Sequence, residues 1–296
     1  MEIHVVQAGE TLYSIADRYN ADLRLLRELN GVPENGALAV GQTLVIRPVE
    51  TFHVVQQGET LTSIARRYGV TLRQLYRRNY WLGGRPEVRA GQSLVIAYRD
   101  APAAQTHTNG YAYPFISAQL LDVELPYMSY LTPFTYGIDA SGGLLPLNDT
   151  AMLSQARSLG TAPLMHLSTL TETDHFSSGR AVMILTDAAR RAALIDQIIS
   201  TISSKGYRGL DVDFEYIPGE QREAYAAFIT QLRRQLAPMG LPVIVALAPK
   251  TYAGQPGLLY EAHDYALLGE AADFVLLMTY GWGMLAHTFT SFINIV

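Results

Sequence analysis

The sequence of 296 residues contains no cysteine, which excludes disulfide bonds and thiolate metal sites. No apolar run approaches the roughly 20 residues that a membrane-spanning helix needs, so no membrane span is expected. The first residues, MEIHVVQ, lack the basic and apolar segments of a classical secretion signal, and we expect synthesis in the cytosol without a signal peptide. The net charge of -5 comes without a basic stretch, and nucleic acid is not an expected partner.

The first hundred residues contain one small module twice. Residues Ile3–Leu12 (IHVVQAGETL) return as Phe52–Leu61 (FHVVQQGETL), an offset of 49. After one inserted residue, Gly41–Ile46 matches Gly91–Ile96. Self-similarity over this length indicates a duplicated domain.

Each copy predicts a βααβ unit. An apolar strand turns at Gly-Glu and enters a helix, with Thr11 and Thr60 as N-caps and apolar residues at helical spacing. A second short helix is expected from about Leu23 to Leu29, followed by a glycine-containing loop and a closing strand. The alternative is a generic small α+β scaffold whose internal similarity reflects duplication alone.

The two copies resemble the LysM domain, which shares the valine-rich strand, Gly-Glu-Thr-Leu, Ser-Ile-Ala, a late Asn and Gly-Gln-x-Leu-x-Ile. The resemblance predicts LysM domains at residues 2–48 and 51–97 and implies binding of N-acetylglucosamine-containing glycans in a shallow groove between two loops. It assigns this groove to Gly9, Thr11, Leu12, Asn30 and Gly31 in the first copy and to Gly58, Thr60, Leu61 and Asn79 in the second. Two modules on one chain raise the effective concentration on a polymeric glycan.

Residues 99–109 are predicted to be a linker into a domain of residues 110–296. There, segments typical of strands alternate with segments typical of helices, which predicts parallel strands joined by crossover helices. Strands are expected near 111–116, 128–136, 162–168, 207–216, 242–248 and 274–281, and helices near 149–159, 187–205, 221–237 and 262–271. The predicted fold class is therefore α/β: two βααβ modules followed by a (β/α)8-type TIM barrel with about six strands present.

Three carboxylates stand two residues apart in the fourth predicted strand, YRGLDVDFEY. Side chains alternate along a strand, so Asp211, Asp213 and Glu215 are expected on one face, and Leu210, Val212, Phe214 and Tyr216 on the other. Like charges this close repel unless they are protonated, hydrogen-bonded or bound to metal, which favours a catalytic site.

This strand and the sixth resemble family 18 glycoside hydrolases, which carry Asp-Gly-x-Asp-x-Asp-x-Glu and Met-x-Tyr. Here the motifs read RGLDVDFE, ending at Glu215, and Met278-Thr-Tyr280. Together with the LysM pair, they look most like spore cortex peptidoglycan hydrolases of the spore-germination N-acetylglucosaminidase type. The resemblance implies a spore or cell-envelope location and no cofactor or metal.

The same resemblance implies the site roles. Glu215 would be the general acid, and Asp213 would raise the pKa of Glu215 and orient the 2-acetamido group of the substrate, which acts as nucleophile. Tyr280 would support the acetamido oxygen, and Asp211 would share a proton or hydrogen bond with Asp213. Met278 and Trp282 are predicted to contact substrate. Alternatively, Met278 and Tyr280 are inward-facing barrel core, and Trp282 is an exposed loop aromatic.

Some residues fall outside this pattern. Arg208 replaces the first Asp of the motif, and Gly281 follows Tyr280 where an acidic residue is common in the family. The histidines His166, His175, His263 and His287 have no metal-ligand spacing and are expected on the surface or as satisfied core residues.

Residues 101–296 are fewer than the about 250 of a typical barrel, so we expect a C-terminally truncated barrel with self-association through the open edge. Two other functions stay open at this point. One is a non-catalytic peptidoglycan-binding protein with a degenerate barrel. The other is a metal-dependent phosphotransfer site built on the three carboxylates, although no phosphate-binding loop is present.

Overall fold

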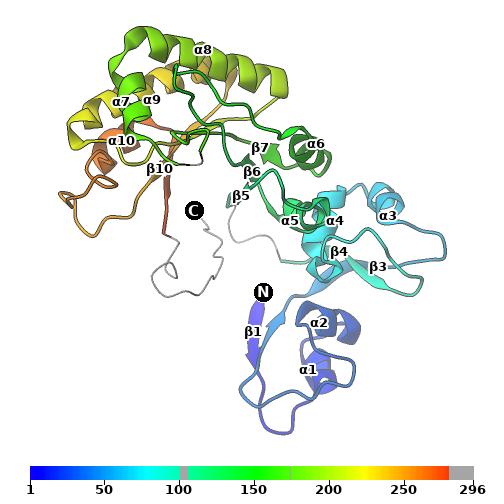
Figure 1. Cartoon of the computed structure of the whole chain (residues 1–296). Helices are drawn as coiled ribbons and strands as arrows, with labels where there is room; N and C mark the ends of the chain where they lie inside the picture. The colour runs from blue at the N-terminus through cyan, green and yellow to red at the C-terminus, as the bar shows by residue number, and fades with distance from the viewer. Residues whose placement is uncertain (101–105, 174, 280–296) are drawn as a thin grey trace. The chain divides into compact units, whose positions relative to one another are not determined.

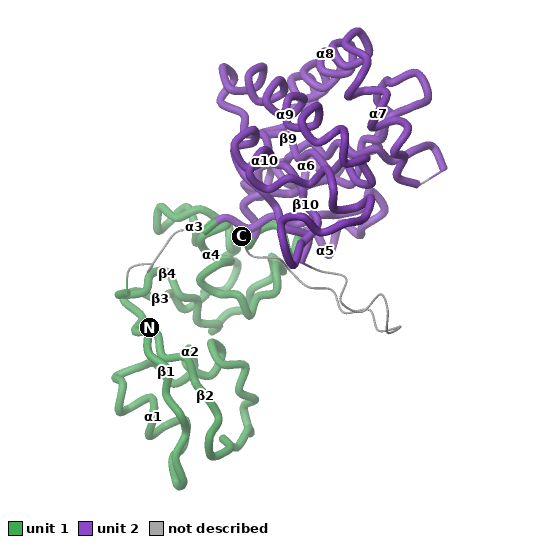
Figure 2. Tube along the Cα trace, turned by 90° about the vertical axis from the view of Figure 1, so that its left-hand side faces the viewer, with its two compact units in different colours: residues 1–106, 122–127 green, residues 107–121, 128–296 purple. Residues whose placement is uncertain are grey.

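The structure is a computed structural model that describes residues 1–100, 106–173 and 175–279 (Figure 1). The chain divides into two compact units (Figure 2). The first comprises residues 1–106 with 122–127, and the second comprises 107–121 with the chain from residue 128 onward. The domain and linker boundaries expected from the sequence stay a prediction. No helix within the described ranges is long and apolar enough to cross a membrane.

The first unit contains two βααβ modules, as predicted. Each module has one antiparallel strand pair, β1 with β2 and β3 with β4, and a hydrophobic core of its own. The elements of the first module are β1 (Glu2–Val5), α1 (Leu12–Arg18), α2 (Leu23–Leu29) and β2 (Thr43–Ile46). Those of the second are β3 (Val49–Val54), α3 (Leu61–Tyr68), α4 (Leu72–Arg78), the 3-10 helix η1 (Tyr80–Leu82) and β4 (Ser93–Tyr98).

The first helix of each module begins at the predicted threonine. The Thr11 hydroxyl accepts a hydrogen bond from the Ser14 backbone N–H at 3.1 Å, and the Ser14 hydroxyl oxygen accepts one from the Thr11 N–H at 2.9 Å. Thr60 and Ser63 form the same reciprocal pair. Both N-cap predictions are confirmed, because each pair satisfies N–H groups that a helix start leaves unpaired.

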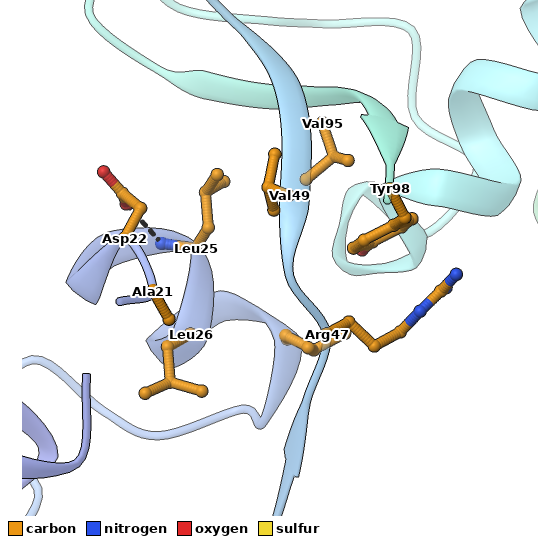
Figure 3. Close-up of a pocket in the computed structure, with 9 residues that line it drawn as sticks. Ala21, Asp22, Leu25, Leu26, Arg47, Val49, Val95 and Tyr98 are labelled. Atoms are coloured by element: carbon orange, nitrogen blue, oxygen red, sulfur yellow. Dashed lines mark hydrogen bonds between the residues drawn. The ribbon is translucent and has the colours of Figure 1, made fainter. Parts of the chain in front are cut away.

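A narrow gap lies between α2 and the strands that follow it (Figure 3). Only Arg47 and Pro48 separate β2 from β3, and the Arg47 guanidinium lies 3.5 Å from the centroid of the Tyr98 ring. The gap measures about 10 Å³, about enough for one water molecule. It is therefore a packing gap and too small to hold a sugar.

The described residues of the second unit form six parallel strand positions in sequence order. The pairing runs β5–β6–β7 and β8–β9–β10–β11, and a parallel bridge between Tyr136 and Leu167 joins the two sheets. Because β7 and β8 together occupy the single strand predicted at 162–168, the prediction of six parallel strands is confirmed. The strands are β5 (Asn109–Ala112), β6 (Tyr130–Pro133), β7 (Ala162–Pro163), β8 (Met165–Ser168), β9 (Leu210–Asp213), β10 (Val243–Leu247) and β11 (Phe274–Leu277).

The helices connect these strands, and α8 and α9 run alongside them (Figure 1). Four helices match predicted segments: α6 (Thr150–Ser158), α8 (Ala188–Lys205), α9 (Arg222–Leu236) and α10 (Tyr265–Ala271). Four other elements were not predicted: α5 (Ala118–Glu124), α7 (Ser178–Thr186) and the 3-10 helices η2 (Leu125–Tyr127) and η4 (Ala237–Met239). A further 3-10 helix, η3 (Gly219–Gln221), precedes α9. Asp187 both ends α7 and caps α8, accepting hydrogen bonds from Ala189 N–H and Arg190 N–H.

The strands separate two apolar layers. Leu210, Val212 and Phe214 are fully buried in the core shared with the covering helices. Ile244, Ala246 and Leu276 belong to a smaller cluster with Leu164, against which Met278 packs partly buried. The two clusters are consistent with the alternation expected along β9 and give Asp211 and Asp213 the face opposite to Leu210 and Val212.

Candidate active site

The three carboxyl groups lie at the carboxyl end of β9. Asp211 and Asp213 belong to the strand and are 0% and 5% exposed, whereas Glu215 follows the strand by two residues and is only partly buried. The strand is shorter than the predicted 207–216. Tyr216 has a φ of +55°, a left-handed conformation that is strained for a residue other than glycine. Tyr216 is also 39% exposed, which corrects the expectation that it packs on the same side as Phe214.

Burial raises the pKa values of all three carboxyl groups. It raises the pKa of Asp211 to about 7, although the hydroxyl of Tyr111, which donates a hydrogen bond to Asp211 Oδ2, acts in the opposite direction. Burial raises the pKa of Asp213 well above its ordinary value, and the neighbouring charges of Glu215 and Asp211 add to the effect. Burial also raises the pKa of Glu215. Carboxyl groups in such surroundings can hold a proton near neutral pH, as a general acid must.

Asp213 faces a neutral histidine. His166 is 1% exposed on β8, its Nε2 lies 3.7 Å from Asp213 Oδ2, and burial lowers the pKa of His166 to about 3. Its Nδ1 lies 2.6 Å from Thr135 Oγ1, and the Thr135 hydroxyl donates to Ser168 Oγ at 3.1 Å. Asp213 Oδ1 is buried with no hydrogen-bond partner among the described residues. A substrate group can therefore donate a hydrogen bond to this oxygen without displacing a protein partner.

His263 links the backbone next to Glu215 to the end of β10 by two hydrogen bonds. The Ala248 N–H, just after β10, donates to His263 Nδ1 at 2.9 Å, so the ring proton of neutral His263 is on Nε2. Nε2 then donates to the carbonyl oxygen of Phe214 at 3.0 Å. His263 is 1% exposed, and both ring nitrogens are hydrogen-bonded, which confirms a satisfied core histidine. These two hydrogen bonds fix the backbone next to Glu215.

A row of aromatic rings leads from β5 to this site. The rings of Tyr113 and Phe115 stack with centroids 5.1 Å apart and planes at 13°, and Tyr113 packs edge-on against Phe134 at 5.1 Å. Phe134 in turn lies 4.9 Å from the His166 ring. Tyr113 and Phe115 are 53% and 83% exposed. Because they follow β5, they stand at the carboxyl ends of the strands, where barrel enzymes bind substrate.

Sequence reasoning missed Tyr111, His166, Thr135 and the stacked rings as parts of this site. For Tyr111 and the stacked rings, a signal was present in the sequence: aromatic residues recur at every second position, 111, 113 and 115, from the start of a predicted strand. Of the predicted substrate contacts, Met278 packs partly buried against the smaller cluster around Leu164, as in the alternative in which it belongs to the barrel core. Tyr280, Trp282, Gly281 and His287 lie outside the described residues. His175 is exposed, as expected.

The residues predicted for the LysM groove divide into two groups. Gly9, Gly31 and Gly58 are exposed with positive φ values, and a side chain added at any of them would meet no atom within 4 Å. Thr11 and Thr60 are exposed at the helix starts. These five residues leave open space at the loops.

The other four groove residues are used inside the modules. Leu61 is 2% exposed in the core, and Leu12 packs partly buried against the core of its module. The fully buried Asn79 donates to the carbonyl oxygens of Leu75 and Val95 and accepts from Val95 N–H at 2.7 Å. Asn30 makes the equivalent bonds with Leu26 and Val45. These four side chains are thus used in the cores and backbone hydrogen bonds of the modules, and their assignment to the glycan groove stays a prediction.

Within residues 1–100, 106–173 and 175–279, no group of three or more His, Asp or Glu side chains is placed to hold a metal ion.

The fold and the carboxyl groups together define a parallel β/α-barrel hydrolase domain preceded by two βααβ modules. The family model for LysM domains matches residues 4–47 and 53–97, and the model for glycosyl hydrolases family 18 matches residues 166–290. The chain therefore carries two LysM domains and a domain that belongs to glycosyl hydrolases family 18, as the sequence motifs predicted.

Several relatives share this arrangement. The chain is 38% identical over 289 residues to the cortical fragment-lytic enzyme of Bacillus subtilis (strain 168), covering 96% of this chain and 66% of that protein. The crystal structure of the Bacillus cereus spore cortex-lytic enzyme SleL is similar with a TM-score of 0.66 and 30% identity, covering 95% of this chain and 66% of that chain. The crystal structure of the spore cortex-lytic enzyme SleL from Bacillus megaterium QM B1551 is similar with a TM-score of 0.63 and 30% identity, covering 94% of this chain and 66% of that chain. The chain thus spans 66% of the length of each of these relatives.

Proposed function

We propose that this chain hydrolyses peptidoglycan or a chitin-type glycan at the bond beside N-acetylglucosamine. The observation that carries the proposal is the series Asp211, Asp213 and Glu215 at the end of β9, with pKa values raised by burial. The similarity to proteins named as cortical fragment-lytic and spore cortex-lytic enzymes supports this class of substrate.

In the proposed mechanism Glu215 donates its proton to the glycosidic oxygen as the bond from that oxygen to C1 breaks. The carbonyl oxygen of the substrate's own 2-acetamido group forms the new bond to C1, while Asp213 accepts a hydrogen bond from the acetamido N–H. Water then attacks C1, the acetamido oxygen leaves, and the water's proton returns to Glu215. Two inversions at C1 give overall retention of configuration.

The surrounding residues keep these groups in the required states. Tyr111 fixes the carboxyl group of Asp211, whose charge adds to the pressure on the pKa of Asp213. His166 stays neutral beside Asp213, so no cation draws the proton from the carboxyl groups. In this proposal Tyr280 supports the acetamido oxygen, and Met278 and Trp282 contact the sugar.

Sugar rings stack on aromatic faces, so the exposed pair Tyr113 and Phe115 is proposed to hold a sugar residue next to the reacting one. The Tyr113 ring packs against Phe134, and Phe134 packs against the buried His166 beside Asp213, so packed rings connect the exposed pair with the carboxyl groups.

The two LysM domains are proposed to hold the same polymer. The open loops at Gly9 and Gly58, next to the exposed Thr11 and Thr60, allow a sugar to approach the backbone closely. Each module alone binds weakly, and the pair gains from effective concentration on a repeating glycan. A spore or cell-envelope location follows from this choice of ligand.

Self-association along β11 is a further part of the proposal. Phe274 and Leu277 on this strand are 58% and 40% exposed, and among the described residues β11 pairs with β10 alone. An unpaired edge invites a second strand. Analytical ultracentrifugation that finds only monomer at high concentration would remove this part.

The mechanism is tested with two matched glycan oligomers, one N-acetylated and one N-deacetylated at the sugar beside the scissile bond. Substrate-assisted catalysis predicts that only the acetylated oligomer is cleaved and that NMR finds the first product with retained anomeric configuration. Cleavage of both oligomers, or an inverted product, would refute the acetamido mechanism. Binding to insoluble peptidoglycan without any cleavage would favour the non-catalytic glycan-binding protein instead.

A further inference from the structure

A buried histidine has the same two partners in both LysM domains. In the first, His4 Nε2 lies 2.8 Å from Glu10 Oε2 and Nδ1 lies 3.2 Å from the Tyr19 hydroxyl. In the second, the corresponding distances from His53 to Glu59 and Tyr68 are 2.6 Å and 3.1 Å. Both histidines are 6% exposed. The pairs recur at the offset of 49 that relates the two modules.

The glutamate has further partners in each module. Glu10 Oε2 also accepts a hydrogen bond from the backbone N–H of Gln7 at 2.8 Å, and Arg18 lies 2.7 Å from Oε1. The Gln7 backbone hydrogen bond, followed by that of His4, lowers the pKa of Glu10. In the second module Gln56 N–H lies at 2.8 Å and Arg67 at 3.2 Å, and the pKa of Glu59 is lowered by the same causes. The carboxylate is therefore held in its charged form.

This carboxylate ties the loop to the body of the module, together with the side chain of the loop glutamine, which donates to the strand carbonyl of Val5 or Val54. In the first copy residues 7, 8 and 9 are exposed, and a side chain at Gly9 would touch nothing. The loop closes through one backbone bond, from Glu10 N–H to Gln7 O at 3.2 Å. Residues 56, 57 and 58 repeat the pattern, with a bond of 3.2 Å from Glu59 N–H to Gln56 O. Because these loop residues are exposed, polar contacts hold the loop, and the carboxylate supplies the charged ones among them.

We infer that the pairs His4–Glu10 and His53–Glu59 position the glycan-binding loops of the two LysM domains before the ligand arrives. This inference rests on the proposed binding of glycan by those domains. A loop that is already in its bound shape spares the ordering entropy that a free loop would lose on binding. Tyr19 and Tyr68 connect the pairs to the far ends of α1 and α3, so each loop is fixed relative to its helix.

The arrangement works with either charge on the histidine. A neutral ring donates from Nε2 to the glutamate and accepts at Nδ1 from the tyrosine hydroxyl. A protonated ring donates from both nitrogens, and the tyrosine oxygen accepts, because a hydroxyl can do either. Replacing the carboxylate with an amide, in contrast, removes the charge that strengthens its hydrogen bonds to the ring and the loop N–H, and it removes the ion pair with the arginine.

The test uses the full chain with Glu10→Gln, Glu59→Gln and the double variant. Glu2→Gln and Glu50→Gln are matched controls, since both remove one negative charge from an exposed position of the same module. Binding to purified peptidoglycan is expected to weaken about fivefold for each single variant and more for the double, while the controls stay within about twofold. All binding is measured well below the unfolding temperature of each variant.

Hydrogen exchange separates loop positioning from overall stability. The amides of Gln7 and Gln56 are expected to exchange at least about tenfold faster in the variants, while the amides of α1 and α3 keep their protection. Should Glu59→Gln not fold, Glu59→Asp keeps the charge but shortens the side chain, and the same direction is expected. Unchanged binding by a folded double variant would overturn the inference and leave glycan binding intact. A wild-type chain that does not bind peptidoglycan would instead overturn glycan binding itself.

Discussion

The hydroxyl of Tyr111 on β5 donates a hydrogen bond to Asp211 Oδ2 on β9, joining strands 100 residues apart inside the barrel. Asp211 is fully buried, and burial raises its pKa from 3.8 to about 7 although the tyrosine lowers it. The carboxyl group nearest the floor of the site is therefore protonated over the acidic range and ionises only near neutrality.

The raised pKa of Asp211 makes the stability of the barrel depend on pH. Because the folded state holds this proton more tightly than the unfolded state, stability falls as pH rises from about 4 to about 7. Asp211→Asn keeps an acceptor for Tyr111 but does not titrate. As pH rises across that window, the free energy of unfolding of the variant should therefore increase relative to that of the wild type, by at most roughly 1.4 kcal/mol per pH unit. Urea unfolding between pH 4 and pH 8 measures the gain, with the exposed Asp196→Asn as control. A difference that does not change with pH would contradict the account.

The two hydrogen bonds of His263 should matter for both stability and turnover. His263→Ala leaves the Ala248 N–H and the Phe214 carbonyl without partners, which should destabilise the barrel by about 2 to 4 kcal/mol. Burial lowers the pKa of His263, so the folded state binds this proton less tightly than the unfolded state does. The wild type therefore loses stability as pH falls below about 6.5, and the stability of His263→Ala should fall less steeply in that range. His175→Ala, at an exposed position, is the control. Equal unfolding temperatures for His263→Ala and His175→Ala would show that the hydrogen bonds of His263 do not stabilise the barrel.

The stacked rings after β5 should affect substrate binding more than the chemical step. Phe115→Ala removes an 83% exposed ring from the pair with Tyr113 and should raise KM about three- to tenfold with little change in kcat. Met239→Ala removes a 45% exposed side chain from η4, which precedes the amino end of β10, away from the carboxyl ends of the strands, and should change neither constant. A fall in kcat with unchanged KM for Phe115→Ala would place the ring in a different role.

Patterns local in sequence predicted much of this molecule. The repeat at an offset of 49 located both βααβ modules and their N-caps at Thr11 and Thr60, because turn and cap residues act on their immediate neighbours. Alternation along β9 placed Asp211 and Asp213 opposite Leu210, since the side chains of a strand must alternate. These features need no knowledge of the rest of the fold.

The remaining features depend on contacts between segments far apart in the chain. Tyr111 reached Asp211 only through the closing of the sheet, and His263 reached Phe214 across 49 residues. β9 ended at Asp213, earlier than its strand-forming residues indicated, and Tyr216 beyond it has a left-handed conformation. Leu61 and Asn79 matched a binding motif, but their burial was decided by the packing of the module, which a motif does not describe.

The most direct test of the account is release of reducing ends from cortex peptidoglycan fragments by the purified chain. Glu215→Gln removes the proposed acid, and Glu220→Gln removes an exposed carboxylate five residues further on. The account predicts that the wild type and Glu220→Gln turn over equally and that Glu215→Gln falls by about 10² to 10⁴. Equal turnover by Glu215→Gln and the wild type would contradict the assignment of Glu215 as the acid.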